Sequence, residues 1–186
     1  MKIVETKIPD LKLIEPARFG DHRGYFGETY SKRKYDDLGI VDEFVQDNHS
    51  LSKAVGTLRG LHFQATPSAQ AKLVRCGRGA IFDVAVDIRI GSPTYGKWEG
   101  YELTAENGLQ LYVPIGFAHG FVTLEPDSEI VYKCSDYYAP QAEGAVLWNS
   151  CGIAWPLVGD PILSDKDTIA PAFNDFNSPF VYGENS

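Results

Sequence analysis

Apolar and polar residues alternate along a segment near the middle of this chain. From Phe82 to Ile88 every second residue is large and apolar, and the intervening residues are Asp83, Ala85 and Asp87. A period of two residues is typical of a β-strand, because successive side chains point to opposite faces of a sheet. We therefore expect a strand here.

Two pairs of strands are expected further along the chain. Turn-forming residues separate the members of each pair, Glu106-Asn107-Gly108 in the first and Pro126-Asp127-Ser128 in the second. Such triplets between alternating segments favour hairpins. The predicted strands lie at residues 98–105 and 109–113, and at 121–124 and 129–134.

One helix is expected near the N-terminus, where Ser31 can cap its start and Gly39 can end it after Leu38. The C-terminal third should consist of loops and short turns because of its prolines, Pro156, Pro161, Pro171 and Pro179. No linker or repeat interrupts the chain, so we expect a single domain, residues 1–186. Short strands at this spacing predict a mainly β sandwich or small barrel with a few short helices.

Charge adds one local feature to this picture. The net charge of -8 argues against binding a nucleic-acid backbone. Between Asn48 and Phe82, however, the chain has no Asp or Glu and carries five cations, Lys53, Arg59, Lys72, Arg75 and Arg78. This run is either a site for a small anion or a solvated strand edge with a chance gap in acids, and composition alone does not separate the two.

The cysteines and the N-terminus indicate the compartment. Cys76, Cys134 and Cys151 are an odd number of widely spaced cysteines, without a C-x-x-C pair, which fits a reduced, cytoplasmic protein. The N-terminal residues lack the apolar core of a signal peptide, and no apolar run is long enough to span a bilayer. We expect a cytoplasmic protein without a membrane partner.

Two stretches resemble the motifs of the cupin family, whose members are jelly-roll β-barrels. The clearer one begins at Gly108 and continues through Pro114 and Gly116 to His119, with Thr123 where the motif has Asn. The resemblance implies a cupin-like barrel.

The other cupin stretch, residues 56–77, contains His62 but departs from the metal-binding pattern. Gln64 and Gln70 stand where a second His and a Glu would be. Divalent metals bind neutral imidazoles and carboxylates, so only His62 and His119 are left as good ligands. Two ligands are too few for a tight site, and we expect a barrel with no metal and no other cofactor.

Four residues are candidates for acid–base chemistry, although each has an ordinary structural interpretation. His62 can be a core histidine, Lys72 a surface lysine, Tyr132 a core tyrosine and Asp167 a solvated turn residue. Tyr132 shares a strand face with Ile130 and Cys134 and should point inward. In a regular strand Arg59 and His62 would face opposite ways, but Gly60 can bulge the strand and change this.

Long, irregular motifs across residues 8–171 resemble the dTDP-4-dehydrorhamnose 3,5-epimerase family. The matching stretches are residues 19–24, 44–50, 58–64, 72–75, 83–89, 91–94, 116–121 and 164–167. Between Asp21 and Arg23 the family more often has Arg or Glu than His22. The resemblance implies an enzyme of dTDP-L-rhamnose synthesis that inverts carbons 3 and 5 of a dTDP-4-keto-6-deoxyhexose.

The resemblance also implies roles for the four candidates. His62 would be the base that removes the proton at both carbons, and Asp167 would bind its other ring nitrogen. Tyr132 would deliver a proton from the opposite face, and Lys72 would lie by the carbon 4 oxygen. A cation there stabilises an enolate, and inversion needs an acid and a base on opposite faces.

Further positions are implied to bind the substrate. Arg59 would bind the diphosphate, because a guanidinium can contact two oxygens. The remaining implied contacts are Arg23, Glu28, Gln46 and Asn48 for the nucleotide, His119, Glu143 and Lys166 in the pocket, and Tyr138 stacked on a sugar or base. In the family, Arg23 and Glu28 reach the neighbouring subunit's site through an exchanged N-terminal strand, which implies a homodimer.

Three alternatives stay open. The first is a related epimerase that inverts one carbon or acts on a different thymidine-linked sugar. The second is a barrel that binds a ligand without catalysis, which would not need all four candidates. The third is a metal-dependent cupin enzyme, which Gln64 and Gln70 disfavour.

Overall fold

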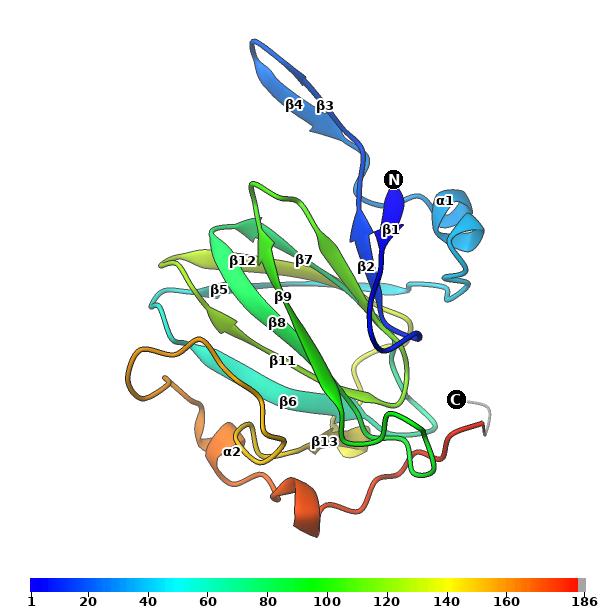
Figure 1. The fold of residues 1–186 in the computed structure, drawn as a ribbon, viewed down its shortest axis with the longest axis vertical. Helices are drawn as coiled ribbons and strands as arrows, with labels where there is room; N and C mark the ends of the chain where they lie inside the picture. Colours follow the sequence, from blue (N-terminus) through cyan, green and yellow to red (C-terminus); the bar gives the residue numbers. More distant parts are fainter. Residues whose placement is uncertain (184–186) are drawn as a thin grey trace.

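The computed structural model describes residues 1–183, and the last three residues of the expected single domain, 184–186, lie outside this range. In the described residues, two large antiparallel sheets pack face to face (Figure 1). One contains, in order, β1 (Lys2–Val4), β2 (Lys12–Glu15), β10 (Gln110–Val113), β7 (Lys72–Arg78), β12 (Ser128–Cys134) and β5 (Gln46–Ser52). The other contains β13 (Glu143–Ala145), β6 (Leu58–Gln64), β11 (Phe117–Thr123), β8 (Ala80–Asp87) and β9 (Trp98–Thr104). The expected mainly β, cupin-like architecture is confirmed.

Both predicted hairpin pairings are wrong, although the strands exist. β9 pairs with β8, whereas β10 pairs with β2 and β7 in the opposite sheet. β11 and β12 likewise belong to different sheets, and β11 begins earlier than expected, at Phe117. The residues at 106–108 and 126–128 do turn the chain, but they carry it from one sheet to the other. Alternation shows that a strand has a buried face, and it does not show which strand supplies its hydrogen bonds.

The predicted N-terminal helix is present as α1 (Lys32–Asp37). Ser31 is at its N-cap position but makes no capping hydrogen bond through its side chain. Gly39 adopts a φ of +75°, and its N–H donates to the Asp36 carbonyl 2.8 Å away. The fully buried Tyr35 anchors the helix in a small core against the six-stranded sheet. Packing of this one face, rather than a side-chain cap, therefore holds the short helix.

The interior between the sheets is apolar at one end. Core residues from both sheets meet there, including Leu103 and Phe121 from the five-stranded sheet and Leu111 and Ile130 from the other. A second core covers the outer face of the five-stranded sheet, where Phe180 packs beside strand residues. As a result β8 is buried on both faces.

The C-terminal third forms this outer cover. It is irregular, as expected, and contains only η1 (Pro140–Ala142), β13, α2 (Asp165–Thr168) and η2 (Phe173–Asp175) within the described residues. In Figure 1 its orange and red segments run past β6 and β13. Phe176 and Phe180 pack edge to face on Phe63 of β6.

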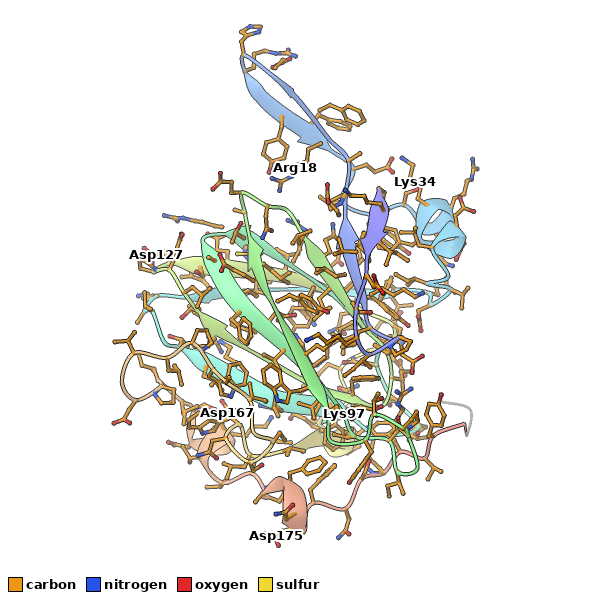
Figure 2. The ribbon with its side chains drawn as sticks, in the orientation of Figure 1. Arg18, Lys34, Lys97, Asp127, Asp167 and Asp175 are labelled. Carbon is orange, nitrogen blue, oxygen red and sulfur yellow. The ribbon has the colours of Figure 1, made fainter. Side chains whose placement is uncertain are left out.

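A hairpin of β3 (Arg18–Asp21) and β4 (Gly24–Gly27) projects away from the two sheets (Figure 1). Arg18 lies at its root (Figure 2), stacks on the Tyr25 ring and donates to the Ala105 carbonyl at 2.8 Å. Phe19, Tyr25 and Phe26 on the hairpin are 67%, 62% and 71% exposed. The hairpin thus presents apolar rings that this chain itself does not cover.

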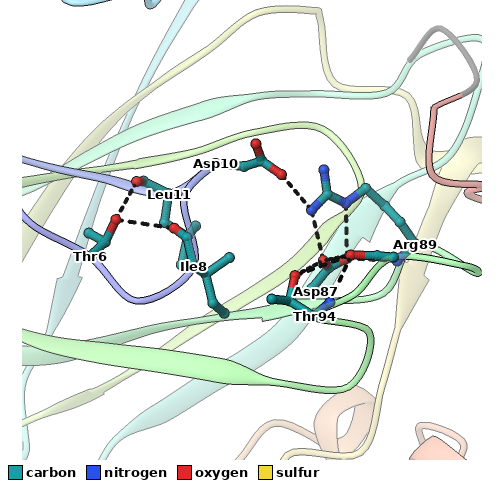
Figure 3. Close-up of polar contacts among 8 residues, drawn as sticks. Thr6, Ile8, Asp10, Leu11, Asp87, Arg89 and Thr94 are labelled. Carbon is teal, nitrogen blue, oxygen red and sulfur yellow. Dashed lines mark hydrogen bonds and ion pairs between the residues drawn. The ribbon is translucent and has the colours of Figure 1, made fainter.

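A polar cluster fastens the end of β8 to the N-terminal loop (Figure 3). The Asp87 carboxylate accepts two bonds from the Arg89 guanidinium and one each from the hydroxyls of Ser92 and Thr94. Arg89 also pairs with Asp10 at 2.8 Å. Burial opposes ionisation of Asp87, but these hydrogen bonds outweigh it and lower the pKa of the carboxyl.

No helix in residues 1–183 is long and apolar enough to cross a membrane.

Candidate active site

Two rows of side chains cross the inner face of the five-stranded sheet. In one row His62 on β6 is paired with His119 on β11. In the next row Arg59 on β6 is paired with Phe121, which is paired in turn with Asp83 on β8. Paired residues of an antiparallel sheet lie on the same face. Because Phe121 belongs to the core between the sheets, both rows face the interior.

Arg59 and His62 share this face because β6 carries an irregularity. Residues three apart in a regular strand point to opposite faces, but the register between β6 and β11 shifts between the two. Gly60 lies at the shift with a φ of +132°, and a Cβ there would be 2.6 Å from the Cα of Gly120. Only glycine accommodates both the backbone angle and the close approach. The expectation that Gly60 changes the direction of the strand is confirmed.

Side chains of the six-stranded sheet face these rows. Lys72 on β7 is paired with Cys134 on β12, which is paired with Gln46 on β5. In the neighbouring row Tyr132 on β12 is paired with Asn48 on β5. Tyr132 packs against the core between the sheets, so it points inward as predicted. The barrel interior therefore brings together residues from six strands, three of each sheet.

His62 and Asp167 form a short hydrogen-bonded pair. The Nε2 atom of His62 lies 2.6 Å from Oδ1 of Asp167, which leaves Nδ1 as the ring nitrogen open to a substrate. Asp167 belongs to α2 (labelled in Figure 2) and is almost completely buried. Its Oδ2 accepts a bond from the hydroxyl of Ser164, the N-cap residue of α2, at 2.7 Å.

Hydrogen bonds stabilise the ionised form of the Asp167 carboxyl. Burial raises the pKa of its carboxyl, but the hydrogen bonds from His62 and Ser164 have the larger combined effect and lower it. An ionised carboxylate can fix one tautomer of the imidazole and stabilise the imidazolium that forms when the ring accepts a proton. This pair is thus suited to a general base.

Tyr132 has the properties of a proton donor. Burial is the main cause that raises the pKa of its phenol, and negative charge on Cys134 would add to it, while Asn48 and Arg59 act in the other direction. The phenol consequently stays protonated at neutral pH. It is on the sheet opposite His62, so an acid and a base approach the barrel interior from different sides.

Lys72 lies within the barrel. Burial lowers the pKa of its ammonium, whereas negative charge on Cys134, Asp83 and Glu143 would raise it. A cation in a partly dehydrated interior interacts strongly with a developing oxyanion.

A polar chain closes one side of the interior. The Gln46 side chain accepts from the Tyr138 N–H at 3.0 Å, and the Tyr138 hydroxyl lies 3.3 Å from the Glu143 carboxylate. Glu143 also pairs with Lys166. Burial opposes ionisation of Glu143, but the bond from Lys166 and other contacts lower the pKa of its carboxyl. Four residues expected to bind the substrate are thereby placed in contact.

Three other expected contacts have hydrogen-bond partners within the chain. Asn48 accepts a bond from the Gln46 amide at 3.1 Å. Arg59 is exposed and reaches β5, where its Nε lies 3.3 Å from the Ser52 hydroxyl. His119 is buried, and its Nε2 lies 2.9 Å from Oδ1 of Asp83.

Arg23 and Glu28 do not join this group. Arg23 is at the tip of the β3–β4 hairpin, where it pairs with Asp21. Glu28 pairs with Lys34 at 2.7 Å and lies in a cleft beside Arg75, on the outer face of the six-stranded sheet. Neither can reach His62 of its own chain in this arrangement.

The two amides at the cupin metal positions have structural partners. Gln64 donates to the Ser68 carbonyl at 2.7 Å and accepts from the Ala139 N–H at 2.9 Å. Gln70 donates to the Asp136 carbonyl at 2.7 Å. In the described part of the chain no three His, Cys, Asp or Glu residues are grouped as metal ligands would be. The amides instead hold the loop that carries Tyr138.

Three residues of the site were not among the predicted site residues. Asp83 and Cys134 face the interior beside His119 and Lys72, and Ser164 orients Asp167. The alternation in residues 82–88 contained a signal for Asp83, because an Asp on one face of an otherwise apolar strand must either meet water or line an internal site. Cys134 was expected on the same inward face as Tyr132, and Ser164 begins the matched stretch 164–167, so the sequence carried a signal for both.

Comparison with known proteins agrees with this geometry. A family model described as dTDP-4-dehydrorhamnose 3,5-epimerase matches residues 5–175. A protein of that name from Salmonella typhimurium is 53% identical over 174 residues, which cover 92% of this chain and 94% of the relative.

Solved structures show the same fold. An epimerase from Legionella pneumophila in complex with dTDP-4-keto-L-rhamnose superposes with a TM-score of 0.91 at 46% identity, covering 95% of this chain and 94% of that one. A 3'-monoepimerase from Streptomyces bikiniensis in complex with dTDP-quinovose gives 0.85 at 37% identity, covering 91% and 87%. The long matched span, the identity and the shared fold together show that the chain belongs to the dTDP-4-dehydrorhamnose 3,5-epimerase family.

Proposed function

We infer that the chain inverts carbons 3 and 5 of dTDP-4-keto-6-deoxy-D-glucose to give dTDP-4-keto-L-rhamnose. The observation that carries this inference is the His62–Asp167 pair, which faces a barrel interior that also holds Lys72 and Tyr132. Relatives about half identical over most of their length are named for this activity.

The chemistry follows from the ketone at carbon 4. Both target carbons lie next to it, so removal of either proton gives an enolate with its charge on the carbon 4 oxygen. We propose that Nδ1 of His62 accepts the proton and that Lys72 stabilises the oxyanion, which develops only along the reaction. Tyr132 then donates a proton to the opposite face of the carbon. The sequence of steps inverts the carbon and regenerates the ketone.

We propose that the other polar groups at the barrel interior bind the substrate. Arg59 would bind the diphosphate, and Gln46 and Asn48 the nucleotide. Tyr138 has a half-exposed ring suited to stacking on the base or sugar. Glu143, Lys166 and His119 complete the pocket in this proposal.

Proton–deuterium exchange tests these roles. In heavy water the wild-type enzyme should place deuterium at carbons 3 and 5 of the sugar nucleotide. His62→Ala should abolish exchange at both carbons. Tyr132→Phe should still exchange deuterium but give little inverted product, because the His62 imidazolium returns the label to the face from which the proton left. Normal exchange in His62→Ala would show that another base acts, and His119 would then be the first candidate.

A second candidate function is inversion at one carbon only. The observation in its favour is the similar fold of a 3'-monoepimerase. The same acid and base would serve both reactions, so geometry does not separate them. Nuclear magnetic resonance of the product does: label and inversion at carbon 3 alone would establish the monoepimerase.

Catalysis without a metal remains a prediction. It is supported by the donor set, because His62 and His119 are each engaged by a carboxylate, and Gln64 and Gln70 bond to the backbone. Full activity should survive exhaustive treatment with a chelator. Activity that disappears and returns with a divalent ion would contradict the proposal.

We also propose that the whole chain is one epimerase domain and acts in the cytoplasm as a homodimer. The projecting hairpin supports the dimer, because its exposed rings need a covering surface and its tip carries Arg23 away from the chain's own site. In a dimer with exchanged strands, Arg23 and Glu28 would reach the partner's pocket.

Mixing two inactive variants tests the exchange. In a dimer of Arg23→Ala and His62→Ala chains, one of the two sites has both intact residues. Refolding the mixture should therefore restore part of the activity, while each variant refolded alone stays inactive. A mixed dimer that forms without recovering activity would count against exchange.

A further inference from the structure

Asp83 is a buried carboxylate whose hydrogen bonding is incomplete. It is in the middle of β8, fully buried, and points into the barrel between the two sheets. Its Oδ1 is 2.9 Å from Nε2 of His119. Within residues 1–183, its Oδ2 is buried without a hydrogen-bond partner. A buried acceptor without a partner is costly, and in native proteins such a group calls for a functional explanation.

The surroundings of Lys72 show which cation this carboxylate can serve. Lys72 extends inward from β7, and its neighbour on β10, Val113, has no charge. The titratable groups acting on it are Cys134 from β12, Glu143 from β13 and Asp83 from β8.

Two of these three groups do not balance the charge of Lys72. Burial raises the pKa of the Cys134 thiol, so it is neutral at neutral pH. The charge of Glu143 is compensated by its ion pair with Lys166. Asp83 is therefore the carboxylate left to balance the charge of Lys72.

We propose that Asp83 is a positioning residue that holds Lys72 as an ammonium and His119 in a fixed orientation at the carbon 4 oxygen. One carboxylate oxygen binds His119, and the other faces the interior, where Lys72 provides the positive charge. This inference rests on the proposed role of Lys72. It assigns to Asp83 a task parallel to that of Asp167, with the first aspartate serving the cation and the second serving the base.

The physical need for such a group is clear from the burial of Lys72. A buried lysine tends to lose its proton, and a neutral amine would stabilise an enolate far less well than an ammonium. A nearby carboxylate offsets this tendency. Asp83 does so from the opposite sheet.

Titration of Lys72 without substrate tests the proposal directly. Protein labelled with ¹³C-lysine gives Cε resonances, and the one lost in Lys72→Arg belongs to Lys72. In Asp83→Asn, which keeps the size of the side chain, the Lys72 resonance should titrate about one pH unit or more below its wild-type value. Asp160→Asn, an exposed control that removes the same charge, should leave this titration where it was. An unchanged Lys72 titration in Asp83→Asn would overturn the proposal.

A second variant covers the case in which Asp83→Asn does not fold. His119→Ala removes the hydrogen-bond donor to Asp83 and leaves the carboxylate more available to Lys72. The Lys72 resonance should then titrate at a higher pH than in the wild type, and a fall or no change would contradict the proposal.

The pH dependence of turnover distinguishes a failure of the proposal for Asp83 from a failure of the proposed catalytic role of Lys72. Loss of the ammonium should end activity at high pH, so Asp83→Asn should move the high-pH limb of kcat to lower pH. In a Lys72→Arg background the same substitution should leave this limb in place, because a guanidinium does not titrate. If the resonance moves but the kcat limb does not, Asp83 holds Lys72 as proposed and it is the role of Lys72 in catalysis that fails.

Discussion

Asp83 and Asp87 are two aspartates on the same strand and the same face, and both are fully buried. Asp87 is saturated, because its two oxygens accept five hydrogen bonds from Arg89, Ser92 and Thr94 (Figure 3). Asp83 has a single hydrogen-bonded partner, His119, and one oxygen without any partner in the described chain. Burial alone therefore does not separate a scaffold residue from a site residue, and the hydrogen-bond partners of the carboxylate must be considered as well.

The difference has a physical basis. A saturated carboxylate gains its full stabilisation in the folded chain and has nothing left to offer a substrate. An incompletely bonded one costs stability, which the fold tolerates when the group acts on a reacting centre. Asp167 is between the two, since both of its oxygens are bonded, but one of its partners is His62, the proposed base.

The largest expected effect is on turnover, in Asp167→Asn. Without the carboxylate, His62 loses the group that fixes its tautomer and stabilises its charged form. We expect kcat to fall by about 10²–10⁴-fold, the usual contribution of a general acid–base group. Steady-state kinetics measure this, and circular dichroism checks that the fold is kept. A fall in kcat of less than tenfold would place Asp167 with the scaffold residues.

The next effect is on stability, in Asp87→Ala. The substitution leaves the Arg89 guanidinium without its main buried partner, and loss of one member of a buried pair costs about 3–5 kcal/mol. Urea denaturation should show this loss, while kcat of the folded fraction changes little. Asp160→Ala is the exposed control. A variant as stable as the wild type but slow in turnover would reverse the assignments of Asp83 and Asp87.

The dependence of the unfolding free energy on pH gives a second test of the role of Asp87. The folded-state pKa of Asp87 lies below the unfolded value of about 3.9, so its contribution is present above that pH and is lost as the pH falls through the folded value. Asp87→Asn removes this dependence. The gap in unfolding free energy between wild type and variant should be widest near neutral pH and should narrow below about pH 4. A gap that does not change with pH would mean that Asp87 has an ordinary pKa.

The smallest effect is expected for Ser164→Ala. This change removes both the N-cap of α2 and the hydroxyl bonded to Asp167, and an N-cap contributes about 1 kcal/mol. We expect a modest fall in stability and a fall in kcat well below that of Asp167→Asn, because His62 still holds the carboxylate. Ser164→Thr, which keeps a hydroxyl, should behave like the wild type. Equal kcat in Ser164→Ala and wild type would show that the His62 bond alone orients Asp167.

The sequence by itself determined several of the strands in the second half of the chain and the chemistry that the site residues carry. Alternation located the strand at residues 82–88, and Gly60 identified the bend that brings Arg59 to the face of His62. The long motifs identified the family, and with it the residues expected to act. These features are local, because each depends on side-chain period, backbone freedom or a contiguous run of residues.

Only the tertiary structure decided which strands are neighbours and which polar residues meet. The turns at 106–108 and 126–128 looked like hairpins but join opposite sheets. At the first turn, β9 and β10 belong to different sheets, and their apolar residues pack in the core between the sheets. Asp83 and Asp87 occupy equivalent polar positions of the alternating segment, and each lies between apolar residues in the sequence. Their different environments come from groups brought to them by other parts of the fold, His119 from β11 for the first and the loop after β8 for the second. Hydrogen bonds between distant segments leave no periodic trace in the sequence, so the contrast between site and scaffold appears only once the chain is folded.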